Sequence, residues 1–261
     1  MSAPELHRHE KFRSRFLRNQ RDFIVYLPPR YHEQPQRRFP VLYMHDGQNL
    51  FDGATSFVPG MDWHVGHTAD DFILTRAVQP LIIVGIYNVG KVRINEYTPT
   101  KAPRLGGGRA DGYAKFLIRE VMPFIQQEYR ALPDPRVTGT GGSSLGGLLS
   151  LYRGLKHPQI FGRLAALSPS VWWNQGVIHR FAVAAPVEPR PRIWLDIGTK
   201  EGPRIVPDVE QFRDILLQKG WQLGKDLNYQ CIEGAEHNEA AWAQRVGPFL
   251  QFLYPAAEST V

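Results

Sequence analysis

The stretch Val137–Tyr152 (VTGTGGSSLGGLLSLY) constrains the fold of this chain more than any other. It runs from a short β-branched segment through a group of small residues into an apolar run that favours a helix. Within it, Gly142-x-Ser144-x-Gly146 fits the G-x-S-x-G pattern of a sharp turn that joins a strand to a helix. Glycines suit such a turn because its backbone is strained and the helix packs closely behind it. The stretch therefore predicts a strand, a tight turn at Ser144 and a helix.

A turn of this kind is typical of the nucleophile elbow, which holds a serine hydroxyl above a sheet. Ser144 is the candidate nucleophile, whereas Ser143 does not fit because Leu145 stands two places after it. The five-residue pattern alone is weak evidence, so the flanking strand, helix and extra glycines carry the argument. The backbone N–H of Leu145, at the start of the helix, can donate a hydrogen bond to a developing oxyanion.

Strands and helices alternate along the chain, which predicts an α/β protein with a doubly wound, mainly parallel sheet and helices on both faces. Besides the strand before Ser144, predicted strands cover 22–27, 41–45, 81–86, 164–167, 192–198 and 227–232. Predicted helices cover 110–129, with a kink at Pro123, and 145–156, 206–217 and 240–254. Residues 52–79 are expected to form an irregular connection. The short connections leave little room for a large lid domain.

Length and composition indicate one domain over residues 1–261. The first twenty residues are basic and are expected to be poorly ordered. No apolar run approaches the length that spans a membrane, and the N-terminus lacks the apolar core of a signal peptide, so a cytoplasmic location is expected. The single cysteine, Cys231, falls in a predicted strand and is expected to be buried.

The net charge of +6 comes mainly from arginine. The basic residues stand between ordinary amphipathic segments and are not interleaved with aromatic residues on one face, as a nucleic-acid site would require. A solvated basic surface is therefore predicted, with no nucleic-acid or membrane partner.

A serine nucleophile needs a base within hydrogen-bond reach and an acid that orients the base. His237 is the candidate base, because it follows the last predicted strand in a turn before the final helix. Glu201 is the favoured acid, since it lies on the turn after strand 192–198. Asp196, inside that strand, and Asp208, near the next helix, stay open as alternatives.

The turn after strand 41–45 offers a second oxyanion donor, the backbone N–H of Gln48. Trp172 and Trp173 follow strand 164–167 at an edge where loops line pockets in open α/β sheets. Together with Trp63 and Arg93, they are the predicted substrate contacts.

Two histidines three residues apart, His64 and His67, have the spacing of metal ligands. No cysteine, third histidine or well-placed acid completes a ligand set near them. No metal and no other cofactor is predicted.

Six segments in order resemble the putative esterase family of α/β-hydrolases: LYMHDGQNLFD, EYTPT, GGSSLGGLLSLY, LSPSVWWN, LDIGTKEG and GAEHNEAAW. The family includes enterochelin-type siderophore esterases, feruloyl and acetyl-xylan esterases, S-formylglutathione hydrolase and the antigen 85 acyltransferases. The resemblance covers about residues 20–254. SPSVWW and RINEYTP are most similar to the siderophore-esterase branch, where this edge contacts the substrate.

The resemblance implies an α/β-hydrolase fold with Ser144 as nucleophile, His237 as base and Glu201 as acid. It also implies that the backbone N–H groups of Leu145 and Gln48 form the oxyanion hole. The predicted function is a serine carboxylic-ester hydrolase that forms an acyl-enzyme with a small-molecule ester. An acyltransferase and a non-catalytic ligand-binding relative are the alternatives. The oligomeric state is not predicted.

Overall fold

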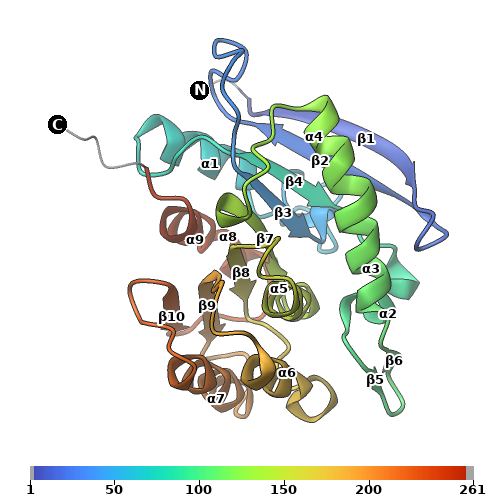
Figure 1. The fold of residues 1–261 in the computed structure, drawn as a ribbon, viewed down its shortest axis with the longest axis vertical. Helices are drawn as coiled ribbons and strands as arrows, with labels where there is room; N and C mark the ends of the chain where they lie inside the picture. Colours follow the sequence, from blue (N-terminus) through green and yellow to red (C-terminus); the bar gives the residue numbers. More distant parts are fainter. Residues whose placement is uncertain (1–2, 257–261) are drawn as a thin grey trace.

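The computed structural model describes residues 3–256. Its centre is one eight-stranded sheet with the strand order β1-β2-β4-β3-β7-β8-β9-β10 (Figure 1). β1 pairs with β2 and β2 with β4 in antiparallel fashion, while the strands from β4 to β10 run parallel. The strands are β1 (Glu5–Arg13), β2 (Gln20–Leu27), β3 (Val41–His45), β4 (Ile82–Ile86), β7 (Thr138–Ser143), β8 (Arg163–Leu167), β9 (Arg192–Gly198) and β10 (Leu227–Ile232). The predicted, mainly parallel sheet is confirmed.

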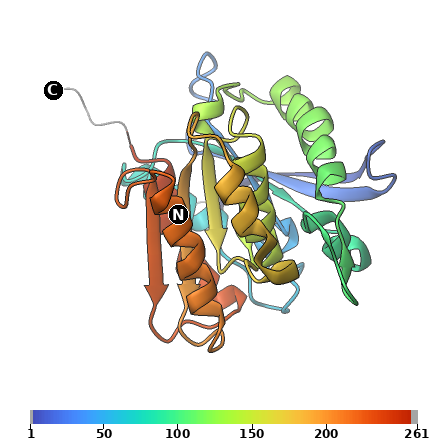
Figure 2. The same ribbon diagram turned by 60° about the horizontal axis from the view of Figure 1, so that its bottom comes forward.

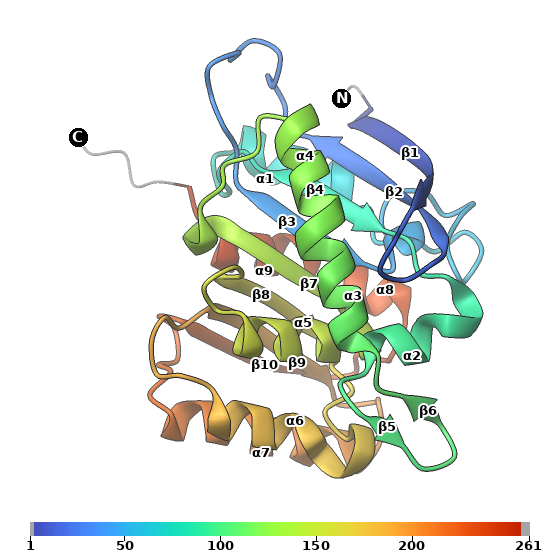
Figure 3. The same cartoon turned by 45° about the vertical axis from the view of Figure 1, so that its right-hand side comes forward.

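Helices cover both faces of this sheet, as predicted. The helices are α1 (Val65–Leu74), α2 (Arg93–Tyr97), α3 (Ala110–Phe116), α4 (Met122–Glu128), α5 (Leu145–Lys156), α6 (Trp173–Ala184), α7 (Ile205–Gln218), α8 (Glu239–Ala243) and α9 (Val246–Leu253). One face carries α3 to α7, and the other carries α1 and α9 (Figure 3). Figure 2 shows α6 and α7 side by side on the first face. A separate hairpin of β5 (Lys101–Ala102) and β6 (Gly106–Gly107) follows α2.

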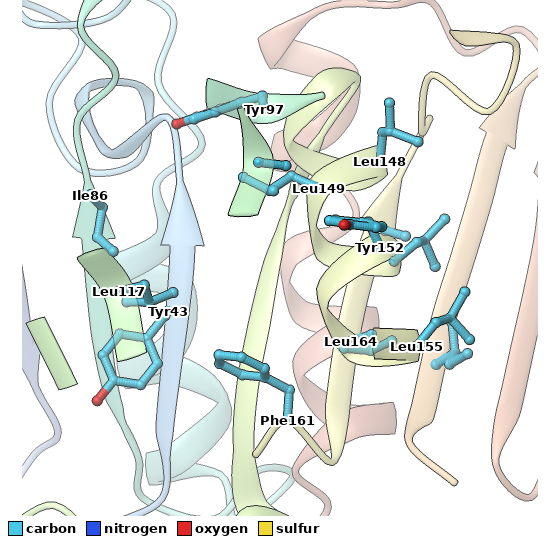
Figure 4. Packing of buried hydrophobic residues seen from close by; sticks show 14 of the residues in the cluster. Tyr43, Ile86, Tyr97, Leu117, Leu148, Leu149, Tyr152, Leu155, Phe161 and Leu164 are labelled. Carbon is cyan, nitrogen blue, oxygen red and sulfur yellow. The ribbon is translucent and has the colours of Figure 1, made fainter. Parts of the chain in front are cut away.

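The two faces arise from the alternation of side chains along each buried strand. In β3, Val41 and Tyr43 pack into the cluster under α3 to α7, while Leu42 and Met44 pack into the cluster under α1 and α9. Figure 4 shows part of the first cluster, with Leu149 and other residues of α5 packed beside the strands. Every residue of β3 is buried, so burial on both faces explains the continuous apolar run.

The N-terminal segment differs from the expectation of poor order, because residues 5–13 form the edge strand β1. Its inward positions carry histidines in place of aliphatic residues, so the sequence looks polar. The ring of His9 stacks on Phe23 with 4.7 Å between centroids, and its Nε2 lies 2.7 Å from the Tyr129 hydroxyl. These contacts hold the segment on the sheet.

Three helices were not expected from the sequence: α1, α6 and the short α2, which lies outside the predicted helices. α1 lies within the stretch 52–79 that was predicted to be irregular, and it buries Val65, Ala69 and Ile73, which are spaced four residues apart. α6 begins irregularly, because residues 174–176 all have positive φ. Because the first residues of α6 are not helical, the apolar spacing typical of a helix is not visible in that part of the sequence.

Other details also differ. The predicted helix 110–129 contains a π-helical turn, Leu117–Val121, which ends two residues before Pro123.

The predicted helix 240–254 is two helices, α8 and α9. Pro248 lies in the first turn of α9, where a backbone N–H has no partner within the helix and its loss removes no hydrogen bond. Cys231 is exposed, because β10 is an edge strand with a neighbour on one side only.

The parallel strands bring the loops after β3, β7, β8, β9 and β10 to the same edge of the sheet. These loops hold most of the predicted site residues. Within residues 3–256, no helix combines the length and the apolar character needed to cross a membrane.

Candidate active site

Ser144 lies in the turn between β7 and α5, with backbone angles φ 55° and ψ −121°. A non-glycine residue in this region is strained, and such strain persists only where the surroundings enforce it. A Cβ added to Gly142 would lie 3.2 Å from the backbone of Gly146, and one added to Gly146 would lie 3.3 Å from the Cβ of His45. The glycines therefore let α5 pack against the strand ends and hold Ser144 in the strained turn.

His237 lies in the turn between β10 and α8, where it contacts Glu201. Its Nδ1 is 2.7 Å from Oε2 of Glu201, whose side chain is 1% exposed. The imidazole packs edge-on against Trp242, with 4.9 Å between ring centroids. Because Nδ1 is engaged by the carboxylate, Nε2 is the ring nitrogen left for a reaction.

The other oxygen of Glu201 is held by two hydrogen bonds. Oε1 accepts a hydrogen bond of 2.6 Å from the Ser168 hydroxyl and one of 2.8 Å from the Gly198 amide. Burial opposes ionisation of Glu201, but the hydrogen bonds from His237, Ser168 and Gly198 outweigh it and hold the pKa of this carboxyl below its ordinary value. Glu201 is thus a fixed, ionised carboxylate beside His237.

The two alternative acids lie elsewhere. Asp196 is fully buried and accepts hydrogen bonds from the Ser168 amide (3.0 Å), Arg245 Nη1 (2.6 Å) and Trp194 Nε1 (2.6 Å). Asp208 lies in the first turn of α7. The structure therefore brings Glu201 to His237, and it places Asp196 in a pair with Arg245.

Ser168 and Arg245 were not singled out from the sequence, although they support Glu201. The Ser168 hydroxyl also accepts hydrogen bonds from Trp242 Nε1 (3.0 Å) and Arg245 Nη1 (2.8 Å). The sequence did contain a signal for Arg245, because it stands in the mostly apolar segment predicted as helix 240–254. An arginine that becomes buried in such a segment is normally paired with an acid.

The turn after β3 is held by an ion pair between the buried Asp46 and the partly exposed Arg93. The carboxylate of Asp46 accepts hydrogen bonds from Arg93 Nε (2.8 Å) and Nη2 (2.7 Å) and from Asn88 Nδ2 (2.7 Å). Asp46 itself has φ 57° and precedes the short 3-10 turn Gly47–Asn49, which contains Gln48. The guanidinium of Arg93, a predicted substrate contact, clamps this turn, and the residue also lines the cavity.

A cavity of about 810 Å³ joins these elements, and Ser144, His237 and Gln48 all line it. The backbone N–H groups of Leu145 and Gln48 donate none of the backbone hydrogen bonds found between turns and loops in residues 3–256. Leu145 is the first residue of α5, and Gln48 is the second residue of the short 3-10 turn Gly47–Asn49; N–H groups at such positions lack intrahelical partners. They are available as donors to a ligand.

The hydroxyl of Ser144 lies 3.3 Å from that of Ser170. Among the hydrogen bonds of the described residues, Ser144 makes none to His237. The Ser170 amide also donates to the carbonyl of Ser144, at 3.0 Å. Ser170 is thus a neighbour of the candidate nucleophile that the sequence did not reveal.

Of the four predicted substrate contacts, Arg93 lines the cavity. Trp63 is 1% exposed and packs in the core against Trp242, while Trp173 is 2% exposed and donates its Nε1–H to the carbonyl of Thr100 at 3.0 Å. These positions correct the expectation for both residues, because their rings are taken up by packing inside the protein. Trp172 is 43% exposed on the loop after β8, outside the cavity lining.

His64 lies 3.2 Å from the carboxylate of Asp62 and is largely exposed. Within the described part of the chain, no group of three or more His, Cys, Asp and Glu side chains is arranged to hold a metal ion.

The chain is similar to known proteins over most of its length. Residues 14–251 match the model of the family described as "Putative esterase". The chain is 26% identical over 256 residues to the uncharacterized protein YbbA of Bacillus subtilis, covering 92% of this chain and 95% of that protein. It is 28% identical over 240 residues to the iron(III) salmochelin esterase of Escherichia coli, covering 85% of this chain and 51% of that protein.

Among solved structures, the ferulic acid esterase AmCE1/Fae1A of Anaeromyces mucronatus superposes with a TM-score of 0.73 at 21% identity, covering 96% of this chain and 91% of that one. This likeness confirms the predicted α/β-hydrolase fold. The family model and several relatives are named as esterases, which confirms the predicted enzyme class, a carboxylic ester hydrolase. The chain therefore belongs to the putative esterase family of α/β-hydrolases.

Proposed function

We propose that this protein hydrolyses small-molecule carboxylic esters through an acyl-enzyme on Ser144, with His237 as general base and Glu201 as its orienting acid. The observation that carries the proposal is the 2.7 Å contact between His237 and the buried Glu201, on the same cavity as the strained turn at Ser144. A serine, an imidazole and a fixed carboxylate in this arrangement are the groups that acyl transfer requires.

In the proposed reaction, Ser144 Oγ attacks the ester carbonyl carbon while its proton passes to His237 Nε2. The carbonyl oxygen becomes an oxyanion, which accepts hydrogen bonds from the amides of Leu145 and Gln48. The tetrahedral intermediate then expels the alcohol, which takes the proton from His237. Water repeats the sequence on the acyl-enzyme, and the acid leaves as Ser144 regains its proton.

The proposal requires the Ser144 hydroxyl to turn from Ser170 toward His237. This movement is a rotation of the serine side chain about one bond. Catalytic hydrogen bonds often tighten only when substrate is present. Glu201, which holds the imidazole from the other side, fixes the ring for that encounter.

The substrate class is tested with a pooled set of esters. The pool contains short-chain p-nitrophenyl esters, methyl ferulate, acetylated xylo-oligosaccharide, S-formylglutathione and a catecholate trilactone, with products read by mass spectrometry. Siderophore and feruloyl esters are included because relatives and structural neighbours are named for them. Hydrolysis that disappears in Ser144→Ala supports the proposal, and the absence of any Ser144-dependent product contradicts it.

Replacing Arg93 with methionine is expected to lower kcat about tenfold or more and to change KM less than about threefold. The reason is that Arg93 clamps Asp46, so its loss loosens the turn that presents the Gln48 amide to the transition state. Steady-state kinetics on one p-nitrophenyl ester measure both constants. Lys91→Met removes the same charge from an exposed position nearby and is the matched control. A rise in KM with kcat unchanged would instead make Arg93 a substrate contact.

A further inference from the structure

Glu239 places a buried carboxylate on the wall of the cavity that holds Ser144 and His237. It is 5% exposed and lies at the start of α8, two residues after His237. Its one hydrogen bond within the described residues comes from the Asn49 amide to Oε1, at 3.3 Å. Carboxylates that are buried to this degree are normally paired with a cation or several donors. Glu239 therefore has capacity for a further donor, and the cavity is where that donor can approach.

The neighbouring charges do not supply this partner. The charge of Arg93 interacts with that of Glu239, but its Nε and Nη2 donate to Asp46, and no ion pair within 4 Å joins it to Glu239 among residues 3–256. Asp46, Arg93 and Glu239 together carry two negative charges and one positive charge. One carboxylate is left in excess on the cavity wall, although the whole chain has a net charge of +6.

Aromatic side chains line the same cavity. They are Phe57, which is 82% exposed on the loop before α1, Tyr87 after β4 and Trp242 in α8. Aromatic faces attract cations through their ring quadrupole, most strongly when water is excluded. A carboxylate that has no ion-pair partner among residues 3–256, in a cavity that aromatic side chains also line, is a combination that recognises an ammonium group.

We propose that Glu239 and the aromatic lining of this cavity bind a cationic group, such as an alkylammonium, on the ester substrate. This inference rests on the proposed ester hydrolysis and adds a charge preference to it. Glu239 is a specificity residue here, because its carboxylate meets a part of the substrate away from the reacting carbonyl.

The test compares esters that differ only in charge. On the alcohol side, acetylcholine is compared with its carbon isostere, in which a tert-butyl group replaces the trimethylammonium group. On the acyl side, a p-nitrophenyl ester whose chain ends in trimethylammonium is compared with the matching tert-butyl ester. For each pair, the ratio of kcat/KM values for the charged and uncharged esters is measured, with Ser144→Ala as the blank.

The expected result is a ratio at least about tenfold higher in the wild type than in Glu239→Gln, in one of the two pairs. The glutamine keeps the acceptor for Asn49 and removes the charge. Glu239→Asp keeps the charge and is expected to retain the preference, which separates charge recognition from damage to the fold. Glu233→Gln, which removes the same charge at an exposed position, is expected to keep the wild-type ratio.

Equal ratios in the wild type and Glu239→Gln for both pairs, with turnover that depends on Ser144, would overturn the cation site and leave the proposed hydrolysis standing. The absence of Ser144-dependent turnover of every ester would overturn the proposed hydrolysis, and the cation site with it.

Discussion

Ser144→Ala is expected to lower kcat for ester hydrolysis by roughly 10⁴- to 10⁶-fold, because loss of the nucleophile removes the acyl-enzyme route. What remains would come from binding and from the oxyanion donors alone. The measurement is steady-state hydrolysis of an activated p-nitrophenyl ester by wild type and variant, with circular dichroism to confirm that both are folded.

The neighbouring serine is the matched control. Ser143 is buried at the end of β7, and removing its hydroxyl is expected to leave kcat within about tenfold of the wild type. If Ser144→Ala kept more than about one hundredth of the wild-type activity, Ser144 would not be the nucleophile.

Glu201→Gln is expected to lower kcat by roughly 10³- to 10⁴-fold. The carboxylate accepts from His237 Nδ1 and would stabilise the imidazolium that forms during the reaction, whereas a neutral amide does so poorly. The kinetic assay is the same, and thermal unfolding is followed in parallel.

Variants of Asp208 and Asp196, the two alternatives to Glu201, test which of the three acids supports catalysis and which supports the fold. Asp208→Asn, in the first turn of α7, is expected to leave kcat within about twofold. Asp196→Asn is expected to lower the free energy of unfolding by about 3 kcal/mol, because it removes the charge that pairs most closely with the buried Arg245, while Glu201 stays 3.7 Å away. A loss of activity in Asp208→Asn equal to that in Glu201→Gln would contradict the assignment of Glu201.

The backbone of the site could be predicted because it depends on local patterns. The buried strands β3, β4 and β9 are short apolar runs, and the turn at Ser144 needs its glycines for the close packing of α5. Since parallel strands end at one edge of a sheet, the order serine, acid, histidine predicted that Ser144 and His237 lie near each other, and it favoured Glu201 over Asp196 and Asp208 as the acid.

The remaining features depend on contacts between distant segments. Nothing in the sequence around Arg93 indicates that it pairs with Asp46, 47 positions earlier. Likewise, Trp63 is buried and Trp172 is exposed because of the segments that pack around each, which the local sequence does not show. The edge strand β1 was missed for a similar reason, because the inward side chain of His9 is stabilised by Phe23 and Tyr129 from other elements. Tertiary contacts decide whether a polar or aromatic side chain lies in the core or at the site.

The central claim is that Ser144 is the activated nucleophile of this cavity. The most direct test treats the wild-type protein with a fluorophosphonate and locates the adduct by peptide mass spectrometry. The account predicts one adduct per chain on Ser144, with loss of esterase activity in proportion to labelling and no adduct in Ser144→Ala. A protein that hydrolyses esters while Ser144 stays unlabelled, or an adduct on another residue that alone abolishes activity, would contradict it.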